Sequence, residues 1–270
     1  MVFPRLIASE HTPHVTRHAV SSGIKELDAL LGTGLESGTS TMLMGPAGVG
    51  KSTIAIRYAV AAADRGDRSA IFTFDETLAN LLSRARGLGM GNLETLAESG
   101  KIVLQQVDPT ELSPGEFVSR VRRLVSQGVK LVVIDSLNGF LNAMPGENYM
   151  AMQLHELLSY LNQQNVTTLL TMAQQGMVGN QIQSPVDVSY LADCVILLRY
   201  FETFGEVKQA ISVIKKRTGH HERTIRELVM RNGAISVGRP LTAFEGVLSG
   251  VPRFVGNLQE VESGGAAGQK

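Results

Sequence analysis

Cysteine is almost absent from this chain of 270 residues, which contains only Cys194. A single cysteine forms no disulfide within the chain, and such sparse use is typical of proteins in a reducing compartment. Long hydrophobic runs are absent too. No apolar stretch reaches membrane-spanning length, and the first residues lack the apolar core of a signal peptide. We therefore expect a cytoplasmic protein without a membrane partner.

An excess of charge of either sign is also missing. Lys and Arg total 25, Asp and Glu total 25, and the formal net charge is zero. A dedicated nucleic-acid binder usually carries a basic surplus, so we do not expect nucleic acid as a partner, although a local basic patch remains compatible with this balance. Apolar residues make up 43% of the chain, enough for one large α/β domain with tails, or two small domains at most.

One glycine-rich stretch stands out: residues 45–53 read GPAGVGKST and fit the phosphate-binding pattern G-x-x-x-x-G-K-[ST]. Its glycines let successive N–H groups point into one hollow that holds phosphate oxygens. Lys51 is expected to reach the β- and γ-phosphates, and the Ser52 hydroxyl to bind Mg²⁺. The nucleotide contacts expected from this stretch are Gly45, Gly48, Val49, Gly50, Lys51, Ser52 and Thr53.

The surroundings of this stretch support the interpretation. Residues 39–44 read as a short strand, and the residues after Lys51 are rich in helix formers and closed by Gly66. A helix that starts at about Lys51 would add its positive N-terminal dipole to the phosphate site.

Acidic residues follow two of the predicted buried strands. Strand 69–74 ends at Asp75 and Glu76, and strand 130–134 ends at Asp135. The carboxyl ends of parallel strands form the ligand-binding edge of α/β sheets. We expect Asp135 to bind Mg²⁺, and we prefer a catalytic role for Asp75 and Glu76 over the alternative that they cap a helix at 77–86.

The rest of the chain alternates helices and strands before it changes rhythm. We expect a short capped helix in 21–32, helices at 113–126 and 149–164, and strands at 101–107 and 166–172. Gln174 and Gln175, after the last of these strands, are equally consistent with a polar loop and with a γ-phosphate sensor. Antiparallel strands follow at 194–198, 209–214 and 224–230, with a hairpin turn at 232–233.

The predicted fold class is therefore α/β, a P-loop NTPase with a mainly parallel central sheet flanked by helices and an appended antiparallel hairpin at its C-terminal side. We assign residues 1–18 to an arm or linker, 19–256 to the domain and 257–270 to a disordered tail. The basic run from Lys215 to His221 is either a solvated loop or a set of cations aimed at a phosphate.

With these features placed, residues 16–256 resemble the RecA superfamily and, within it, the KaiC family of circadian-clock ATPases. The motifs that carry the resemblance are Ser22-Gly23-Ile24, Leu27-Asp28, residues 45–53, residues 72–76, residues 134–137, Ala192-Asp193, residues 215–221 and residues 244–250.

The resemblance implies an ATPase that forms six-membered rings with ATP between subunits. Lys215 and Arg217 match residues that reach the γ-phosphate of the neighbour's ATP, and Asp75-Glu76 match residues that activate water. An arginine supplied in trans adds charge where the transition state needs it. The expected nucleotide contacts, partly in trans, then also include Leu88, Lys215, Lys216, Arg217, Gly219 and His221.

The sequence also departs from the family pattern. Asp75 stands where the family usually has Glu, so hydrolysis is slower or the base role passes to Glu76. Some family members phosphorylate themselves on a Ser-Thr pair, which is Ser189-Tyr190 here, so Ser189 alone remains a possible acceptor. The clock members have two such domains in tandem and a C-terminal regulatory segment. This chain has one such domain, and its arm at residues 2–18 suits an inter-domain linker, so we expect a fragment of a longer protein.

Two other functions stay open at this point. A DNA-dependent RecA-type motor needs basic loops, but the candidate segments 138–148 and 176–186 contain no Lys or Arg. The second open function is a nucleotide-gated binding platform with little turnover. It is favoured by Asp75, whose side chain is one methylene shorter than the family's usual Glu.

Overall fold

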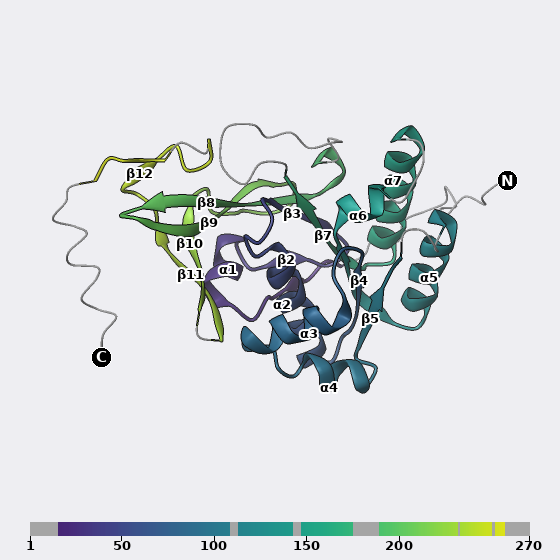
Figure 1. The fold of residues 1–270 in the computed structure, drawn as a ribbon. Helices are drawn as coiled ribbons and strands as arrows, with labels where there is room; N and C mark the ends of the chain where they lie inside the picture. The colour runs from purple at the N-terminus through teal and green to yellow at the C-terminus, as the bar shows by residue number, and fades with distance from the viewer. Residues whose placement is uncertain are drawn as a thin grey trace.

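The structure is a computed structural model that describes residues 16–108, 113–142, 147–174, 189–231, 233–249 and 252–256. Within these residues nine strands form one sheet with helices on both faces (Figure 1). Their bounds are β3 (Ser40–Gly45), β4 (Arg68–Thr73), β5 (Ile102–Gln106), β6 (Val129–Asp135), β7 (Thr167–Ala173), β8 (Cys194–Thr203), β9 (Glu206–Lys216), β10 (Arg226–Arg231) and β11 (Ala234–Pro240).

The strand order across the sheet is β11-β10-β9-β8-β3-β7-β6-β4-β5. The strands from β8 to β5 run parallel to one another, and β9, β10 and β11 continue the sheet in antiparallel pairs. This arrangement confirms the predicted fold class. It also places the carboxyl ends of β3, β4, β6 and β7 side by side along one edge of the sheet.

Seven α-helices lie in the described residues, divided between the two faces (Figure 1). Leu43 of β3 belongs to the apolar cluster on one face and Met42 to the cluster on the other, as the alternation of side chains in a strand requires. The first cluster includes residues of α1 (Lys25–Leu30), α2 (Lys51–Asp64), α3 (Leu78–Gly87) and α4 (Leu93–Glu98), and the second of α5 (Pro114–Ser126), α6 (Leu137–Asn142) and α7 (Glu147–Gln163).

Short elements complete the described chain. Strand β1 (Ala19–Val20) pairs with β2 (Leu35–Glu36), β12 (Phe244–Glu245) pairs with β13 (Arg253–Phe254), and a single 3₁₀ turn, η1, covers Ser189–Leu191. The first strand starts at residue 19. Most of the predicted arm, residues 1–15, and the predicted tail, residues 257–270, lie outside the described residues.

Local signals predicted the longer elements well. Ser113 and Glu116 form the expected capping box at the start of α5, since the Ser113 hydroxyl accepts from the Glu116 N–H and the Glu116 carboxylate accepts from the Ser113 N–H. Strands β10 and β11 pair in antiparallel fashion on either side of the predicted 232–233 turn, where Gly233 has φ 74° and residue 232 lies outside the described residues. Of the described helices, none is long and apolar enough to cross a membrane.

Two local expectations need correction. The helix within residues 21–32 is only Lys25–Leu30, and Ile24 occupies its N-cap without a side-chain bond. The Ser21 and Ser22 hydroxyls donate instead to the carboxylate of Asp28, and they accept from the N–H groups of Gly23 and Ile24, which precede the helix. The segment 138–148 is not one loop. Helix α6 covers Leu137–Asn142, α7 begins at Glu147, and residues 143–146 are not described.

Candidate nucleotide-binding site

The loop between β3 and α2 has the backbone expected of a phosphate cradle. Gly45 ends the strand with φ at 155°, and Gly50, at φ 107°, is the N-cap of α2. A Cβ built on Gly45 would lie 2.4 Å from the backbone oxygen of Leu198 on the adjacent strand. The strand therefore passes too close to β8 for any larger residue at this position.

Lys51 begins α2 with its ammonium group turned back onto this loop. Its Nζ donates to the backbone oxygens of Gly45 at 2.8 Å and Pro46 at 2.6 Å. The residue is buried, and burial lowers the pKa of Lys51 to about 8, while the carboxylate of Asp135 opposes that shift. The ammonium therefore lies inside the cradle, where an anionic group would favour its charged form.

Ser52 and Asp135 meet across the ends of α2 and β6. The Ser52 hydroxyl donates to Oδ1 of Asp135 at 2.9 Å, and the hydroxyl of Thr171, on β7, donates to the same oxygen. Burial raises the pKa of Asp135, and the two hydroxyl donors partly offset that rise. A carboxylate beside a hydroxyl is the kind of oxygen donor set that binds Mg²⁺ together with substrate phosphates, so these residues fit that ion.

The two acids after β4 differ in their surroundings. Asp75 is exposed, and one of its oxygens accepts from the hydroxyl of Ser136. Both oxygens of Glu76 contact the guanidinium of Arg84 on α3, which also donates to the hydroxyl of Thr53. Glu76 is thus held in a bidentate ion pair tied to α2, whereas Asp75 keeps an oxygen available to solvent.

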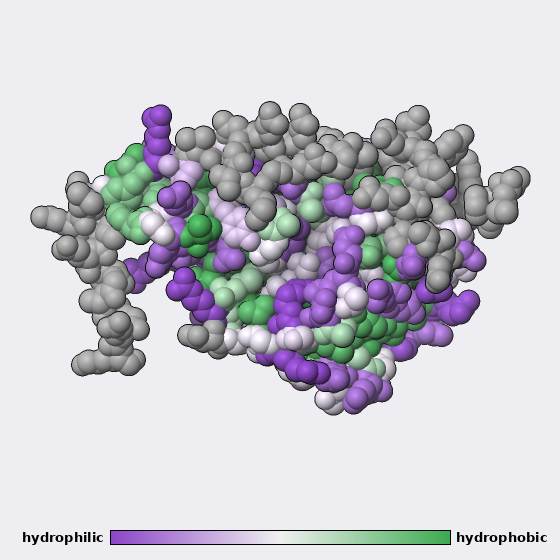
Figure 2. Space-filling model, in the orientation of Figure 1, coloured by the Kyte–Doolittle hydropathy of each residue, from purple (hydrophilic) through white to green (hydrophobic). Residues whose placement is uncertain are grey.

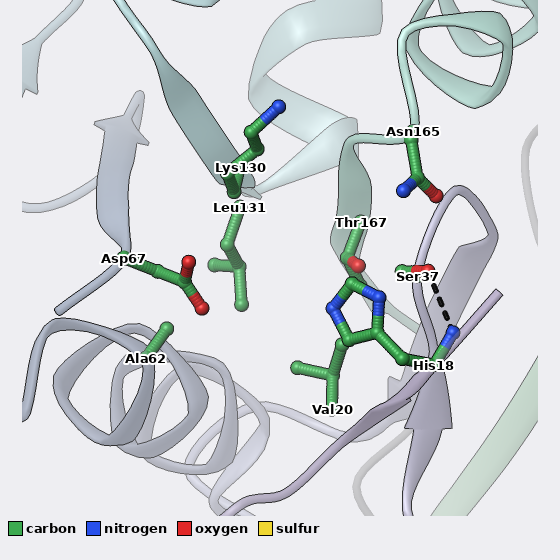
Figure 3. Close-up of a pocket in the computed structure, with 9 residues that line it drawn as sticks. All are labelled: His18, Val20, Ser37, Ala62, Asp67, Lys130, Leu131, Asn165 and Thr167. Carbon is green, nitrogen blue, oxygen red and sulfur yellow. Dashed lines mark hydrogen bonds between the residues drawn. The ribbon is translucent and has the colours of Figure 1, made fainter. Parts of the chain in front are cut away.

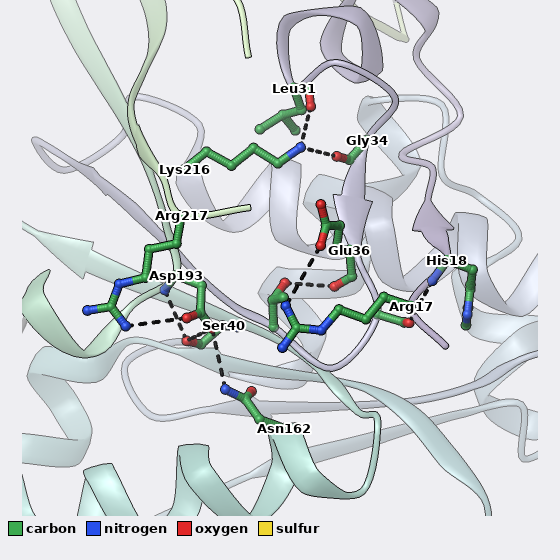
Figure 4. Close-up of polar contacts among 12 residues, drawn as sticks. Arg17, His18, Leu31, Gly34, Glu36, Ser40, Asn162, Asp193, Lys216 and Arg217 are labelled. Carbon is green, nitrogen blue, oxygen red and sulfur yellow. Dashed lines mark hydrogen bonds and ion pairs between the residues drawn. The ribbon is translucent and has the colours of Figure 1, made fainter. Parts of the chain in front are cut away.

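The cations predicted to act in trans lie at the opposite end of the parallel strands from the P-loop, where these strands begin. Lys216 ends β9 and pairs with Cys194, the first residue of β8, so residues 215–217 lie near Ser40, where β3 begins. Figure 4 shows Lys216 pointing toward the 31–34 turn, where its Nζ donates to Leu31 and Gly34, and Arg217 pointing toward Asp193. Lys215 donates to the backbone oxygen of Ala192.

The remaining predicted residues are scattered over both edges. Leu88 lies on a shallow cavity of about 180 Å³ with Gly23, Arg57 and Gly233, beside α2. Gly219, at φ 72°, and His221 follow the cations at the far edge. Ser189 begins η1.

Gln174 follows β7 at the P-loop edge. Its backbone N–H donates to Gly45, and its side-chain oxygen is buried without a partner. Gln175 is outside the described residues.

Three residues that contact the site were not predicted from the sequence. Thr171 and Arg84 bind the predicted acids from other elements, and Tyr200 donates from β8 to the backbone oxygen of Ala47 in the P-loop. Thr171 could have been noticed as a hydroxyl near the end of a strand. Arg84 and Tyr200 carry no motif, because their roles depend on strand and helix packing.

Two other surface features lie apart from these residues. A cavity of about 100 Å³ opens between β1 and the starts of β6 and β7, lined by His18, Lys130 and Asn165 among others (Figure 3). At the tip of the β8–β9 hairpin, Phe204 and Val207 are exposed, and apolar residues gather at that end of the molecule (Figure 2). Among the described residues, no group of three or more His, Cys, Asp or Glu side chains forms a metal cluster.

Fold and site together define a RecA-like P-loop protein, with the phosphate loop after β3 and an acid as the last residue of β6 on the same sheet edge. A family model described as "ATPase: KaiC" matches residues 20–242. The chain belongs to this family.

Curated proteins of low sequence identity support the same family assignment. The circadian clock protein KaiC3 of Synechocystis sp. is 25% identical over 244 residues, or 90% of this chain and 48% of the relative. The clock oscillator protein KaiC of Thermosynechococcus vestitus is 25% identical over 262 residues, which cover 97% of this chain and 50% of the relative. KaiC of Synechococcus elongatus is 25% identical over 252 residues, which cover 93% of this chain and 48% of the relative. The chain spans about half the length of these relatives.

Proposed function

We propose that this chain binds ATP with Mg²⁺ and hydrolyses it at the interfaces between subunits of a six-membered ring. The P-loop, Ser52 and Asp135 supply the part of the site that holds the phosphates. Mg²⁺ held by Ser52 and Asp135 would neutralise charge on the β- and γ-phosphates. Lys51 would exchange the carbonyls of Gly45 and Pro46 for phosphate oxygens.

Asp75 is our candidate for the residue that accepts a proton from the attacking water. It is exposed at the end of β4, and the contact with Ser136 orients its carboxylate. Glu76 is less suited to the task because Arg84 engages both of its oxygens. We assign Glu76 and Arg84 the role of holding the last turn of α3 against Thr53 on α2.

The observation that carries the ring proposal is the separation of the P-loop from the basic residues 215–217. They lie at opposite ends of β3, which spans about 17 Å for five residue steps. Arg217 therefore does not complete the nucleotide site of its own subunit. It is half exposed, as a residue that serves a neighbouring subunit must be.

Serine autokinase activity is a second candidate function, favoured by one contact. Arg217 Nη2 donates to the backbone oxygen of Tyr190 at 2.8 Å, next to Ser189. If Arg217 reaches a neighbour's γ-phosphate, η1 comes close to the same phosphate. The circadian-clock role named for the relatives concerns those longer proteins, and we extend only their ATP chemistry to this chain.

The test is to measure mass in solution with and without Mg²⁺-ATP, and then to map phosphorylated residues and released ADP. We expect ring-sized particles only with nucleotide, slow ADP release, and phosphate on Ser189 if the chain is an autokinase. Lys51→Ala by itself should bind no ATP and stay dissociated, since it lacks the phosphate-binding ammonium. A wild-type chain that stays monomeric in ATP would contradict the ring.

A further inference from the structure

Asp193, the residue before β8, connects two parts of the molecule that the ring proposal treats separately. Its Oδ2 accepts from the backbone N–H of Ser40 at 2.9 Å and from the Ser40 hydroxyl at 3.0 Å (Figure 4). Its Oδ1 faces Nη1 of Arg217 at 3.5 Å, and its backbone oxygen accepts from the N–H of Arg217 at 2.8 Å. One oxygen is thus fixed to β3, and the other is turned toward Arg217.

The contacts of Arg217 hold one side of its guanidinium. Nη1 faces Asp193, and Nη2 donates to the backbone oxygen of Tyr190. A guanidinium has five N–H donors in a planar fork, so these contacts leave donors for an anion outside the subunit. The Arg217 side chain is 52% exposed, while that of Asp193 is 19% exposed. The Asp193 carboxylate therefore holds the guanidinium of Arg217 from its inner side, and the exposed side of the guanidinium faces solvent.

The anchor of Asp193 belongs to the strand that ends in the P-loop. Ser40 is the first residue of β3, and Gly45 is the last. A rigid strand therefore connects the nucleotide loop of a subunit with the carboxylate that orients its own Arg217.

We propose that Asp193 is the positioning residue for Arg217: it presents the guanidinium to the nucleotide of the neighbouring subunit and links that presentation to the subunit's own P-loop strand. This inference rests on the proposed function, because it requires Arg217 to act across an interface. Asp193 itself touches no nucleotide in this arrangement. Its effect on turnover passes entirely through Arg217.

Asp193→Asn tests the proposal, since the amide keeps an oxygen for Ser40 but loses the charge opposite Arg217. The kcat for ATP hydrolysis should fall about fivefold, as expected for a part-exposed ion pair, while KM for ATP and ring mass stay near wild type. Asp67→Asn is the matched control, because Asp67 lies at the same edge of the sheet in the 100 Å³ cavity. It should leave kcat unchanged.

The decisive measurement repeats Asp193→Asn in an Arg217→Ala chain. A positioning residue has nothing left to position there, so the residual turnover should not fall further. An equal fivefold loss in that background, or an unchanged kcat in the single variant, would overturn the proposal. If Arg217→Ala alone turns over ATP normally, the trans role in the proposed function fails first and this inference fails with it.

Discussion

Lys51 and Asp135 are charged side chains in places where burial opposes their charge. Burial lowers the pKa of the first to about 8 and raises the pKa of the second. Each group therefore costs folding free energy while the nucleotide is absent, and phosphate and Mg²⁺ would relieve that cost. A site that is unfavourable when empty is common where function requires it.

Lys51→Met should stabilise the nucleotide-free chain. The pKa of Lys51 is about 8 when folded and 10.5 ordinarily, so the folded chain bears the full cost of the buried charge below pH 8. That cost disappears as pH rises from 8 to 10.5. We expect the variant to raise the free energy of unfolding by about 2 kcal/mol at pH 7, and by much less at pH 10.

Urea unfolding at both pH values measures this, with Lys101→Met, at an exposed lysine, as the control that should change little. A less stable Lys51→Met chain at pH 7 would show that the two carbonyl contacts of Lys51 outweigh its desolvation.

The same residues show how far sequence reasoning reaches at this scale. The positions of Lys51, Ser52 and Asp135 at one sheet edge follow from a motif of fixed spacing and an acid after a buried strand. The positions of Thr171 and Arg84 do not, because their contacts join elements far apart in the chain. Likewise, no sequence pattern distinguishes the exposed Asp75 from Glu76 in its ion pair.

At the scale of elements, length and capping explain why some helices were predicted from the sequence and α4 was not. Helices α2, α5 and α7 have long apolar patterns, and α5 has a capping box. Helix α4 has six residues and no side-chain cap, so Leu93 and Leu96 hold it only by packing against the core. Such a helix leaves no local signal, since its stability comes from tertiary contacts.

Two glycines near the ends of α2 provide a matched pair of substitutions. Both have positive φ, 155° at Gly45 and 97° at Gly66. A Cβ on Gly66 meets nothing within 4 Å, whereas one on Gly45 meets the Leu198 backbone at 2.4 Å. Gly66→Ala should cost about 1 kcal/mol of stability from φ strain alone, and Gly45→Ala about 3 kcal/mol or more.

Thermal unfolding of the two variants measures the difference, and binding of a non-hydrolysable ATP analogue should be lost only for Gly45→Ala. Equal losses of stability would mean that β3 and β8 can separate at this point.

At the scale of the whole molecule, the sheet carries the P-loop at the carboxyl ends of its parallel strands and the basic residues 215–217, which we propose as the second half of a nucleotide site, at the opposite ends. The alternation of helices and strands was enough to predict the parallel sheet and its phosphate edge. The sequence did not predict that the basic run begins at the other end of these strands. This position follows from the register of β9, in which Lys216 pairs with Cys194. This arrangement makes the subunit interface, and not the subunit, the unit of activity in the proposed ring.

Mixing two inactive variants tests that arrangement directly. Lys51→Ala lacks the phosphate-binding ammonium but keeps Arg217, and Arg217→Ala has the reverse defect. Each alone should turn over ATP at a small fraction of the wild-type rate. Combined in equal amounts before ATP is added, they should assemble through the ATP that the Arg217→Ala subunits bind. The mixture should then regain about a quarter of the wild-type rate, because one interface in four joins an intact Lys51 to an intact Arg217.

Arg223→Ala, an exposed arginine in the same loop, should by contrast retain normal activity when assembled alone. Mixed rings confirmed by mass that stay as inactive as their parents would mean that Arg217 does not act across the interface.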